Sequence, residues 1–133
     1  MDRLKERLRV AQEALATFIE ALNVEKPSSL ERDGTIQRFE YTFETCWKAC
    51  QRYLYIQEGS DCASPKSCLR GIGKAGILDE AQTVAALKMT DDRNRTTHIY
   101  HEKIAEEIYS RLPKYQQLIG VMLDGMQKNM QQE

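Results

Sequence analysis

The stretch that decides the fold is IQRFEYTFETCWKACQRYL, residues 36–54. Its apolar side chains recur at steps of three and four residues, which is the period of one helix face. Trp47 and Leu54, seven residues apart, begin a second apolar line beside this stripe. The main stripe consists of Ile36, Phe39, Phe43, Cys46, Cys50 and Tyr53.

We expect this helix to run from about Arg32 or Ile36 to Glu58. Two apolar lines suggest more than one neighbour, such as a bundle core and a dimer partner, and one wide core face is the equally good alternative. The aromatic side chains suit either reading, because aromatics bury much area and concentrate in cores and interfaces. They are Phe39, Tyr41, Phe43, Trp47, Tyr53 and Tyr55.

Helical periodicity continues on both sides of this stretch. The segment before it carries one heptad-like stripe and is followed by a turn over residues 23–29. The stripe consists of Leu4, Leu8, Ala11, Leu15, Phe18 and Leu22. After it, Ser64 and Pro65 have the pattern of a helix start, and Gly76 suits the end of that short helix. Asp79 is the expected N-cap of a helix that carries Ala81, Val84, Ala85 and Leu87 and ends near residues 91–94.

The last part of the chain predicts two further helices. One begins near Thr96 or Thr97 and is punctuated by Pro113, and the other carries Tyr115 to Met126. Strand-like alternation is nowhere sustained. The sequence therefore predicts an all-α, up-and-down four-helix bundle with additional short helices and short connections, in one domain over residues 1–133.

Composition and charge exclude several classes of protein. The chain has 133 residues, of which 41% are hydrophobic, and 19 basic against 20 acidic residues give a net charge of −1. This excludes intrinsic disorder and removes the bulk attraction behind nonspecific nucleic-acid binding. Any RNA contact must come from a local basic cluster. The charged N-terminus is unlike a secretory signal, and no run is apolar enough to span a membrane, so we expect a cytoplasmic protein.

The four cysteines are Cys46, Cys50, Cys62 and Cys68. A reducing compartment argues against disulfides, and no C-x-x-C pair suggests a zinc site. Cys46 and Cys50 share one helix face, where small buried residues are a better explanation than metal ligands.

Residues 91–101, DDRNRTTHIYH, hold both histidines and two arginines at a helix junction. Histidine suits proton transfer, arginine offers a fork of donors for phosphate, and a helix start favours anions. The alternative is structural: Arg93 pairs with Asp92 or with a carboxylate on another helix, while His98 caps or packs. Composition and spacing alone favour the structural alternative.

Other sites have weaker support. His98, His101 and Glu102 could be imagined as metal ligands, but no further ligand has matching spacing, so we expect no metal. The glycine-rich residues 71–76 lack the preceding strand and the ending of a phosphate loop. No cofactor is expected.

Three stretches in order resemble HepT-like proteins of the HEPN superfamily, also called nucleotidyltransferase substrate-binding proteins. Arg93, four residues, then His98-Ile99-Tyr100 resembles their R-x4-H-x-Y motif. FEYTFE followed by WK, residues 39–48, resembles a helix of the family. Residues 64–70 together with 75–79 resemble its S-P-x-x-x-L-R segment and the A-G-l-i-D that follows.

The resemblance implies a homodimeric bundle that partners a minimal nucleotidyltransferase as toxin and antitoxin. Arg93 and His98 would be the catalytic residues of a metal-independent ribonuclease, and Asn94 would support them. Tyr100 would receive AMP from the antitoxin, which silences the toxin. RNA cleavage by 2′-hydroxyl attack would leave a 2′,3′-cyclic phosphate, and RNA affinity would depend more on Arg93 than on surface lysines.

Two other functions stay open. In one, the dimer is a non-catalytic nucleotidyltransferase substrate-binding subunit, and Arg93 and His98 only bind nucleotide phosphate. In the other, the chain is a helical dimerisation protein with a structural Arg–Asp network. The chain also departs from the resemblance: Gly71 and Gly73 stand where helix formers are commoner, and Val84 and Leu87 occupy a region where tryptophan is common. These glycines put local helix stability in question.

Overall fold

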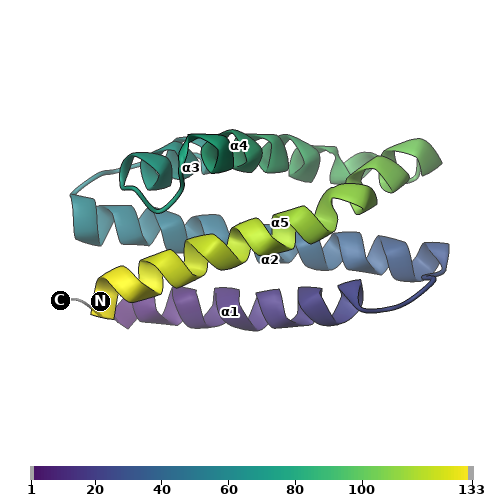
Figure 1. Ribbon diagram of the computed structural model, residues 1–133, viewed down its shortest axis with the longest axis horizontal. Coiled ribbons are helices and arrows are strands. Elements are labelled where there is room, and N and C mark those ends of the chain that lie inside the picture. The colour runs from purple at the N-terminus through teal and green to yellow at the C-terminus, as the bar shows by residue number, and fades with distance from the viewer. Residues whose placement is uncertain (1, 132–133) are drawn as a thin grey trace.

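The computed structural model describes residues 2–131, and within this range all regular structure is helical. The all-α prediction is therefore confirmed (Figure 1). The elements are α1 (Asp2–Leu22), α2 (Ser29–Glu58), α3 (Pro65–Lys74), α4 (Glu80–Arg95), the 3-10 helix η1 (Thr96–His98) and α5 (Glu102–Gln131).

The helices form a bundle with an added layer. The long helices α1, α2 and α5 pack on one another, and α5 crosses the bundle obliquely (Figure 1). The shorter helices α3 and α4 lie together on the side away from α1. The N-terminal end of α1 and the C-terminal end of α5 lie at the same end of the molecule, and the junction of α4 with α5 lies at the other.

The predicted apolar stripes form the core. Every member of the α2 stripe is buried, and so is every member of the α1 stripe except Leu22, which is partly buried. Burial at about 25 cal/mol per Å² of apolar surface makes this stripe-to-stripe contact the main source of stability. Leu54, in the second line on α2, is also buried, and it lies against Gly71 of α3. The second line therefore has a neighbour within the chain.

Capping residues define where three helices begin. Ser64 and Asp79 are N-caps of α3 and α4, as predicted, and each forms a capping box. The start of α2 differs from the prediction. Ser28 caps it and exchanges hydrogen bonds with Glu31, so α2 begins at Ser29 rather than at Arg32 or Ile36. The first turn holds few apolar residues, and the S-x-x-E signal alone marks it.

The prediction of two helices separated by Pro113 is wrong, because α5 continues through this residue. A proline inside a helix costs about 3 kcal/mol. The apolar residues keep one helical stripe on both sides of Pro113, and their burial outweighs this cost. The stripe runs Ala105, Ile108, Leu112, Tyr115, Ile119, Met122 and Met126.

The apolar residues expected on α4 divide between its two sides: Ala85 and Leu87 pack partly buried against the core, whereas Val84 is 63% exposed and Ala81 is exposed. The fully buried residues of α4 are Ala86, Met89, Thr90 and Asp92. Small apolar residues lie on all sides of this helix, so their periodicity selects no face.

Gly71 and Gly73 have a packing role that the sequence did not reveal. A Cβ atom on Gly71 would lie 2.6 Å from Cδ1 of Leu54, and one on Gly73 would lie 2.4 Å from Oγ1 of Thr83. The missing side chains let α3 approach α2 and α4 closely. These glycines, which lower helix propensity, therefore allow α3 to dock.

The expectation that all cysteines are reduced is wrong at one pair, because Cys62 and Cys68 form a disulfide with a Cα–Cα distance of 5.4 Å. Cys62 lies in the segment that joins α2 to α3, and its carbonyl accepts a hydrogen bond from the side chain of Gln51 on α2 at 2.8 Å. Cys68 lies on the first turn of α3. Cys46 and Cys50 are free and buried in the core. No helix in the described range is long and apolar enough to cross a membrane.

Candidate functional site

The R-x4-H-x-Y residues lie where α4 passes into α5. Arg93 and Asn94 are on the last turn of α4, His98 closes η1, and Tyr100 precedes α5. The chain stays helical from Arg93 to His98 and then turns, with the amide of His101 donating to the carbonyl of His98 at 3.0 Å. This hydrogen-bonded turn fixes the backbone between His98 and His101.

His98 and Tyr100 contact each other directly. Nδ1 of His98 lies 3.3 Å from the hydroxyl oxygen of Tyr100, and the two rings meet edge to face at 5.9 Å. Both side chains are solvent-exposed, Tyr100 to 75%. The Tyr100 ring also stacks obliquely on His101, with centroids 4.7 Å apart. The motif histidine and tyrosine thus form one accessible cluster.

Arg93 points in another direction. Its Nη2 donates to Oε2 of Glu44 on α2 at 3.2 Å, and its Nε is buried without a hydrogen-bond partner in the described structure. Both side chains of this ion pair are about one-third exposed. The pairing with a carboxylate on another helix, which the structural alternative predicted for Arg93, is present. No hydrogen bond links Arg93 to His98 among residues 2–131.

Asp92, next to Arg93 in the sequence, is a buried carboxylate that links α4 to α5. This carboxylate is only 2% exposed and accepts hydrogen bonds from Tyr115 at 2.5 Å and from Arg111 at 3.0 and 3.1 Å. Burial, and then the bond to Asp92, raises the pKa of the Tyr115 phenol. A buried carboxylate is stable only when it is paired in this way. Asp92 therefore fixes the end of α4 to α5.

Ion pairs of Arg95, which is partly exposed, and of Arg32, which is buried, complete the junction. Arg95 reaches Asp92 and also Glu107, and the bond between Arg95 and Glu107 lowers the pKa of the Glu107 carboxyl. Arg32 forms a bidentate pair with Glu102, which joins the start of α2 to the start of α5 and lowers the pKa of Glu102.

The remaining sequence candidates lie apart from these contacts. Asn94 is exposed on the last turn of α4. Within the described residues, no three His, Cys, Asp or Glu side chains are arranged to hold a metal ion, and this includes His98, His101 and Glu102.

Sequence reasoning missed three residues of the site: Glu44, Asp92 as a buried acceptor, and Tyr115. Glu44 belongs to the FEYTFE stretch, so a signal for it was present. The sequence did not indicate that Asp92 and Tyr115 would pair. Asp92 belongs to a run of charged residues, and Tyr115 belongs to an apolar stripe.

Comparisons with known proteins agree with this fold. The sequence profile described as "Nucleotidyltransferase substrate binding protein like" matches residues 6–128. A crystal structure of a protein from Thermus thermophilus is 46% identical, covers 87% of this chain and 98% of that one, and superposes with a TM-score of 0.84. None of the curated proteins is significantly similar in sequence.

Two more distant structures share the fold. HI0074 from Haemophilus influenzae, described as the fold of a substrate-binding domain of a nucleotidyltransferase, is 21% identical with a TM-score of 0.74. The match covers 90% of this chain and 98% of that one. A toxin–antitoxin structure with AMP-PNP is 11% identical with a TM-score of 0.70, and the match covers 95% and 98% of the two chains. The match of the profile over residues 6–128 shows that this chain belongs to the family of nucleotidyltransferase substrate-binding-like proteins.

Proposed function

We propose that this chain is the HepT-like subunit of a pair with a minimal nucleotidyltransferase, and that it is a metal-independent ribonuclease toxin. The contact between His98 and Tyr100 carries this proposal. It supports one exposed site for both events that the function requires, which are cleavage of RNA at His98 and modification at Tyr100.

In the cleavage step, the 2′-hydroxyl of a ribose attacks the adjacent phosphorus. The bond to the 5′-oxygen of the next nucleotide breaks, which gives a 2′,3′-cyclic phosphate and a free 5′-hydroxyl. His98 takes or returns a proton, and Arg93 stabilises the charge that develops on the phosphoryl oxygens. Asn94, exposed beside Arg93, is proposed to support substrate placement.

One motif histidine in each chain is few for a step that moves two protons. A homodimer that brings two motifs to one cleft would supply both. The exposed aromatic side chain of Tyr100, within the motif itself, supports an interface on this side of the molecule. Cleavage by the dimer would then depend on both protomers, and mixing wild-type with His98→Ala chains should lower activity more than dilution does.

Silencing would use the nucleotidyltransferase and ATP. The Tyr100 oxygen attacks the α-phosphorus of ATP, pyrophosphate leaves, and Tyr100 carries AMP. This adds negative charge within reach of His98 and removes the hydroxyl proton from their contact. Mass spectrometry after incubation with the cognate enzyme and ATP tests this step. A mass increase on Tyr100 that is absent from Tyr100→Phe is expected, and unmodified Tyr100 would contradict it.

A non-catalytic substrate-binding subunit is the second candidate, because the Arg93–Glu44 pair gives Arg93 a structural role in the free chain that requires no catalysis. A ribonuclease assay with EDTA separates the two. Cleavage that Arg93→Ala abolishes supports the ribonuclease. No cleavage, with retained binding to the nucleotidyltransferase, supports the binding subunit.

A further inference from the structure

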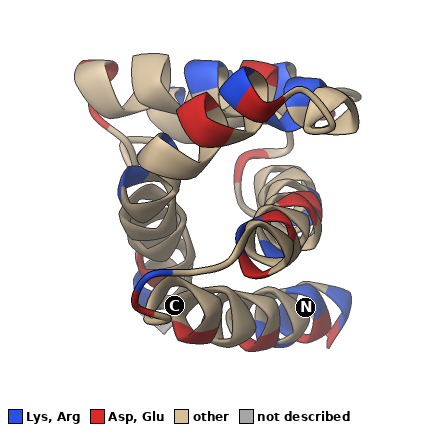
Figure 2. Ribbon diagram, turned by 90° about the vertical axis from the view of Figure 1, so that its right-hand side faces the viewer, with Lys and Arg blue, Asp and Glu red and all other residues tan. Residues whose placement is uncertain are grey.

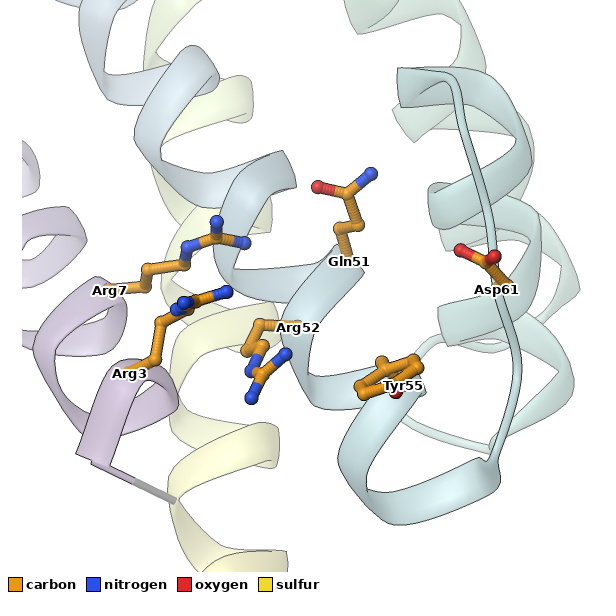
Figure 3. Close-up of a pocket in the computed structure, with 6 residues that line it drawn as sticks. All are labelled: Arg3, Arg7, Gln51, Arg52, Tyr55 and Asp61. Atoms are coloured by element: carbon orange, nitrogen blue, oxygen red, sulfur yellow. The ribbon is translucent and has the colours of Figure 1, made fainter.

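A second basic cluster lies at the opposite end of α2 from the cap that begins it. Arg3 and Arg7 from the first turns of α1, and Arg52 from α2, line an open pocket of about 240 Å³ (Figure 3). Tyr55 and Gln51 of α2 and Asp61 of the following loop complete the lining. We call Arg3, Arg7 and Arg52 the arginine cluster.

These arginines are not neutralised by the protein. Within residues 2–131, no carboxylate lies at ion-pair distance from any of the three, and Asp61 stands across the pocket from the guanidinium groups (Figure 3). Other arginines on the same helices meet acidic partners: Arg9 pairs with Glu6 and Glu13, and Arg32 with Glu102. Acidic and basic residues are interspersed over the helices in general (Figure 2). The arginine cluster is therefore a local excess of positive charge on a balanced surface.

The cluster is held in place at an electrostatic cost. Arg7 donates to the main-chain carbonyl of Lys48 at 3.0 Å, which fixes it against α2. Burial, and then the neighbouring charges of Arg3 and Arg52, lower the pKa of Arg7. The Nε atom of Arg52 is buried with no hydrogen-bond partner in the described structure. An anion that binds here would relieve this repulsion and supply acceptors for unused donors.

The other groups in the pocket indicate what kind of anion it takes. The guanidinium of Arg52 lies over the Tyr55 ring at 5.1 Å, and this ring is 55% exposed. An exposed aromatic ring beside arginines is the arrangement that binds single-stranded nucleic acid, with phosphates on the cations and a base on the ring. The pocket is smaller than the ~300 Å³ at which enclosed small-molecule sites begin, so it suits a phosphate and one base better than a whole cofactor.

One face of α2 connects the cluster to Arg93 of the motif. Glu44, Lys48 and Arg52 are spaced by four residues and so share one face of α2. Glu44 holds Arg93, Lys48 lies 3.8 Å from Glu44, and Arg52 is in the cluster. The eight residues from Glu44 to Arg52 correspond to about 12 Å along the helix axis. A few nucleotides of extended single strand cover that length, and a longer strand is needed to reach His98, because the α4–α5 junction lies toward the other end of the molecule (Figure 1).

We propose that the arginine cluster with Tyr55 is a second RNA-binding subsite, which holds the phosphate backbone of a single strand whose scissile bond lies at the motif. This inference rests on the ribonuclease function proposed above and extends it. The cluster supplies binding affinity, and the motif supplies chemistry.

The test measures binding separately from cleavage. A fluorescently labelled, fully 2′-O-methylated oligonucleotide cannot be cleaved by 2′-hydroxyl attack, and its anisotropy reports affinity. We expect the triple variant Arg3→Gln/Arg7→Gln/Arg52→Gln to bind roughly tenfold or more weakly, with the salt slope of log K reduced by about 2, since each phosphate contact contributes about 0.7 on single strands. Tyr55→Leu should weaken binding about fivefold or more.

Two controls make the result specific. Arg70→Gln removes one exposed positive charge on α3 outside the pocket, and its affinity should stay within twofold of wild type. Helical circular dichroism and an unchanged thermal midpoint of the triple variant would show that its loss of RNA affinity is not caused by unfolding. Arg52→Lys, which keeps the positive charge, should retain most of the RNA affinity.

The outcomes also separate this inference from the function on which it rests. Wild-type affinity and salt slope in the triple variant overturn the subsite. The same holds if the triple variant keeps RNA affinity but loses binding to the nucleotidyltransferase, which would make the pocket a protein-docking surface. RNA binding that depends on the cluster, without any cleavage of an unmodified strand by wild type, supports the subsite while contradicting the ribonuclease.

Discussion

Arg93 and Glu44 join the end of α4 to the middle of α2 through a hydrogen-bonded ion pair of 3.2 Å, although 49 residues separate them in sequence. The guanidinium that the resemblance assigns to phosphate is therefore neutralised in the free chain. A phosphate must compete with this carboxylate or displace it. The pair is only partly exposed, so solvent weakens it without removing it.

Replacing Glu44 with glutamine should strengthen RNA binding. The change removes the competing negative charge and leaves Arg93 available to phosphate. An exposed ion pair contributes about 0.2–1 kcal/mol, so we expect affinity for a 2′-O-methylated strand to rise about 1.4- to fivefold. Fluorescence anisotropy measures this. Glu20→Gln, which removes an exposed charge from α1, is the matched control, and equal effects of the two variants would argue against a specific role for Glu44.

Replacing Asp92 with asparagine should destabilise the junction. The amide presents donor hydrogens to Tyr115 and Arg111, which also donate, and leaves the partly exposed Arg111 without its counter-charge. Breaking a buried pair costs about 3–5 kcal/mol, and partial hydrogen bonding by asparagine should bring the loss to about 2–3 kcal/mol. Urea unfolding gives the free energy. Asp91→Asn, at an exposed position that pairs with Lys66, should cost less than about 0.5 kcal/mol. Equal losses in both variants would show that Asp92 is not an anchor.

Glycine-to-alanine changes should have opposite effects at two helical positions. At Gly34 a Cβ atom would meet nothing within 4 Å, so alanine should stabilise α2 by about 0.5–1 kcal/mol. At Gly71 the new Cβ would clash with the buried side chain of Leu54, and we expect a net loss of about 1–3 kcal/mol from overpacking. Thermal and urea unfolding of both variants check this. Stabilisation by Gly71→Ala would show that α3 does not dock on α2 as described.

Acid should loosen the start of α5. Arg32 lowers the pKa of Glu102, and Arg95 lowers that of Glu107, both from an ordinary value of 4.5. A carboxyl whose pKa is lower in the folded than in the unfolded state contributes stability above the unfolded pKa, and this contribution is lost as pH falls through the folded pKa. The variant Glu102→Gln/Glu107→Gln should therefore lose less thermal stability than wild type between about pH 5 and pH 3. Melting curves over this range test it, and parallel curves for the two proteins would contradict it.

Much of the fold could be predicted, because the core of α1 and α2 is made of large apolar side chains at strict helical spacing. Phe39 and Phe43, for example, identify the buried face of α2. The fourth helix could not be oriented in the same way, since alanines surround Val84 on several sides. The prediction at Pro113 was wrong because the low helix propensity of proline is outweighed by the burial of the apolar stripe that continues along α5 on both sides of it.

The site was predictable only in part. The R-x4-H-x-Y spacing pointed to the junction, where His98 and Tyr100 do meet. The partner of Arg93 lies on another helix, and spacing carries no information about contacts at such separation. The disulfide between Cys62 and Cys68 depends likewise on how the loop after α2 folds back. The arginine cluster was missed because its members come from two helices.

Cleavage of a synthetic RNA in the presence of EDTA tests the central claim most directly, with wild type and His98→Ala compared at equal concentration and the product ends identified by mass spectrometry. The account predicts that wild type cuts the strand and leaves 2′,3′-cyclic phosphates, and that His98→Ala is about 100-fold or more slower, since positioned acid–base groups contribute about 10²–10⁴-fold. Equal rates for the two proteins, or no cleavage by wild type, would contradict it.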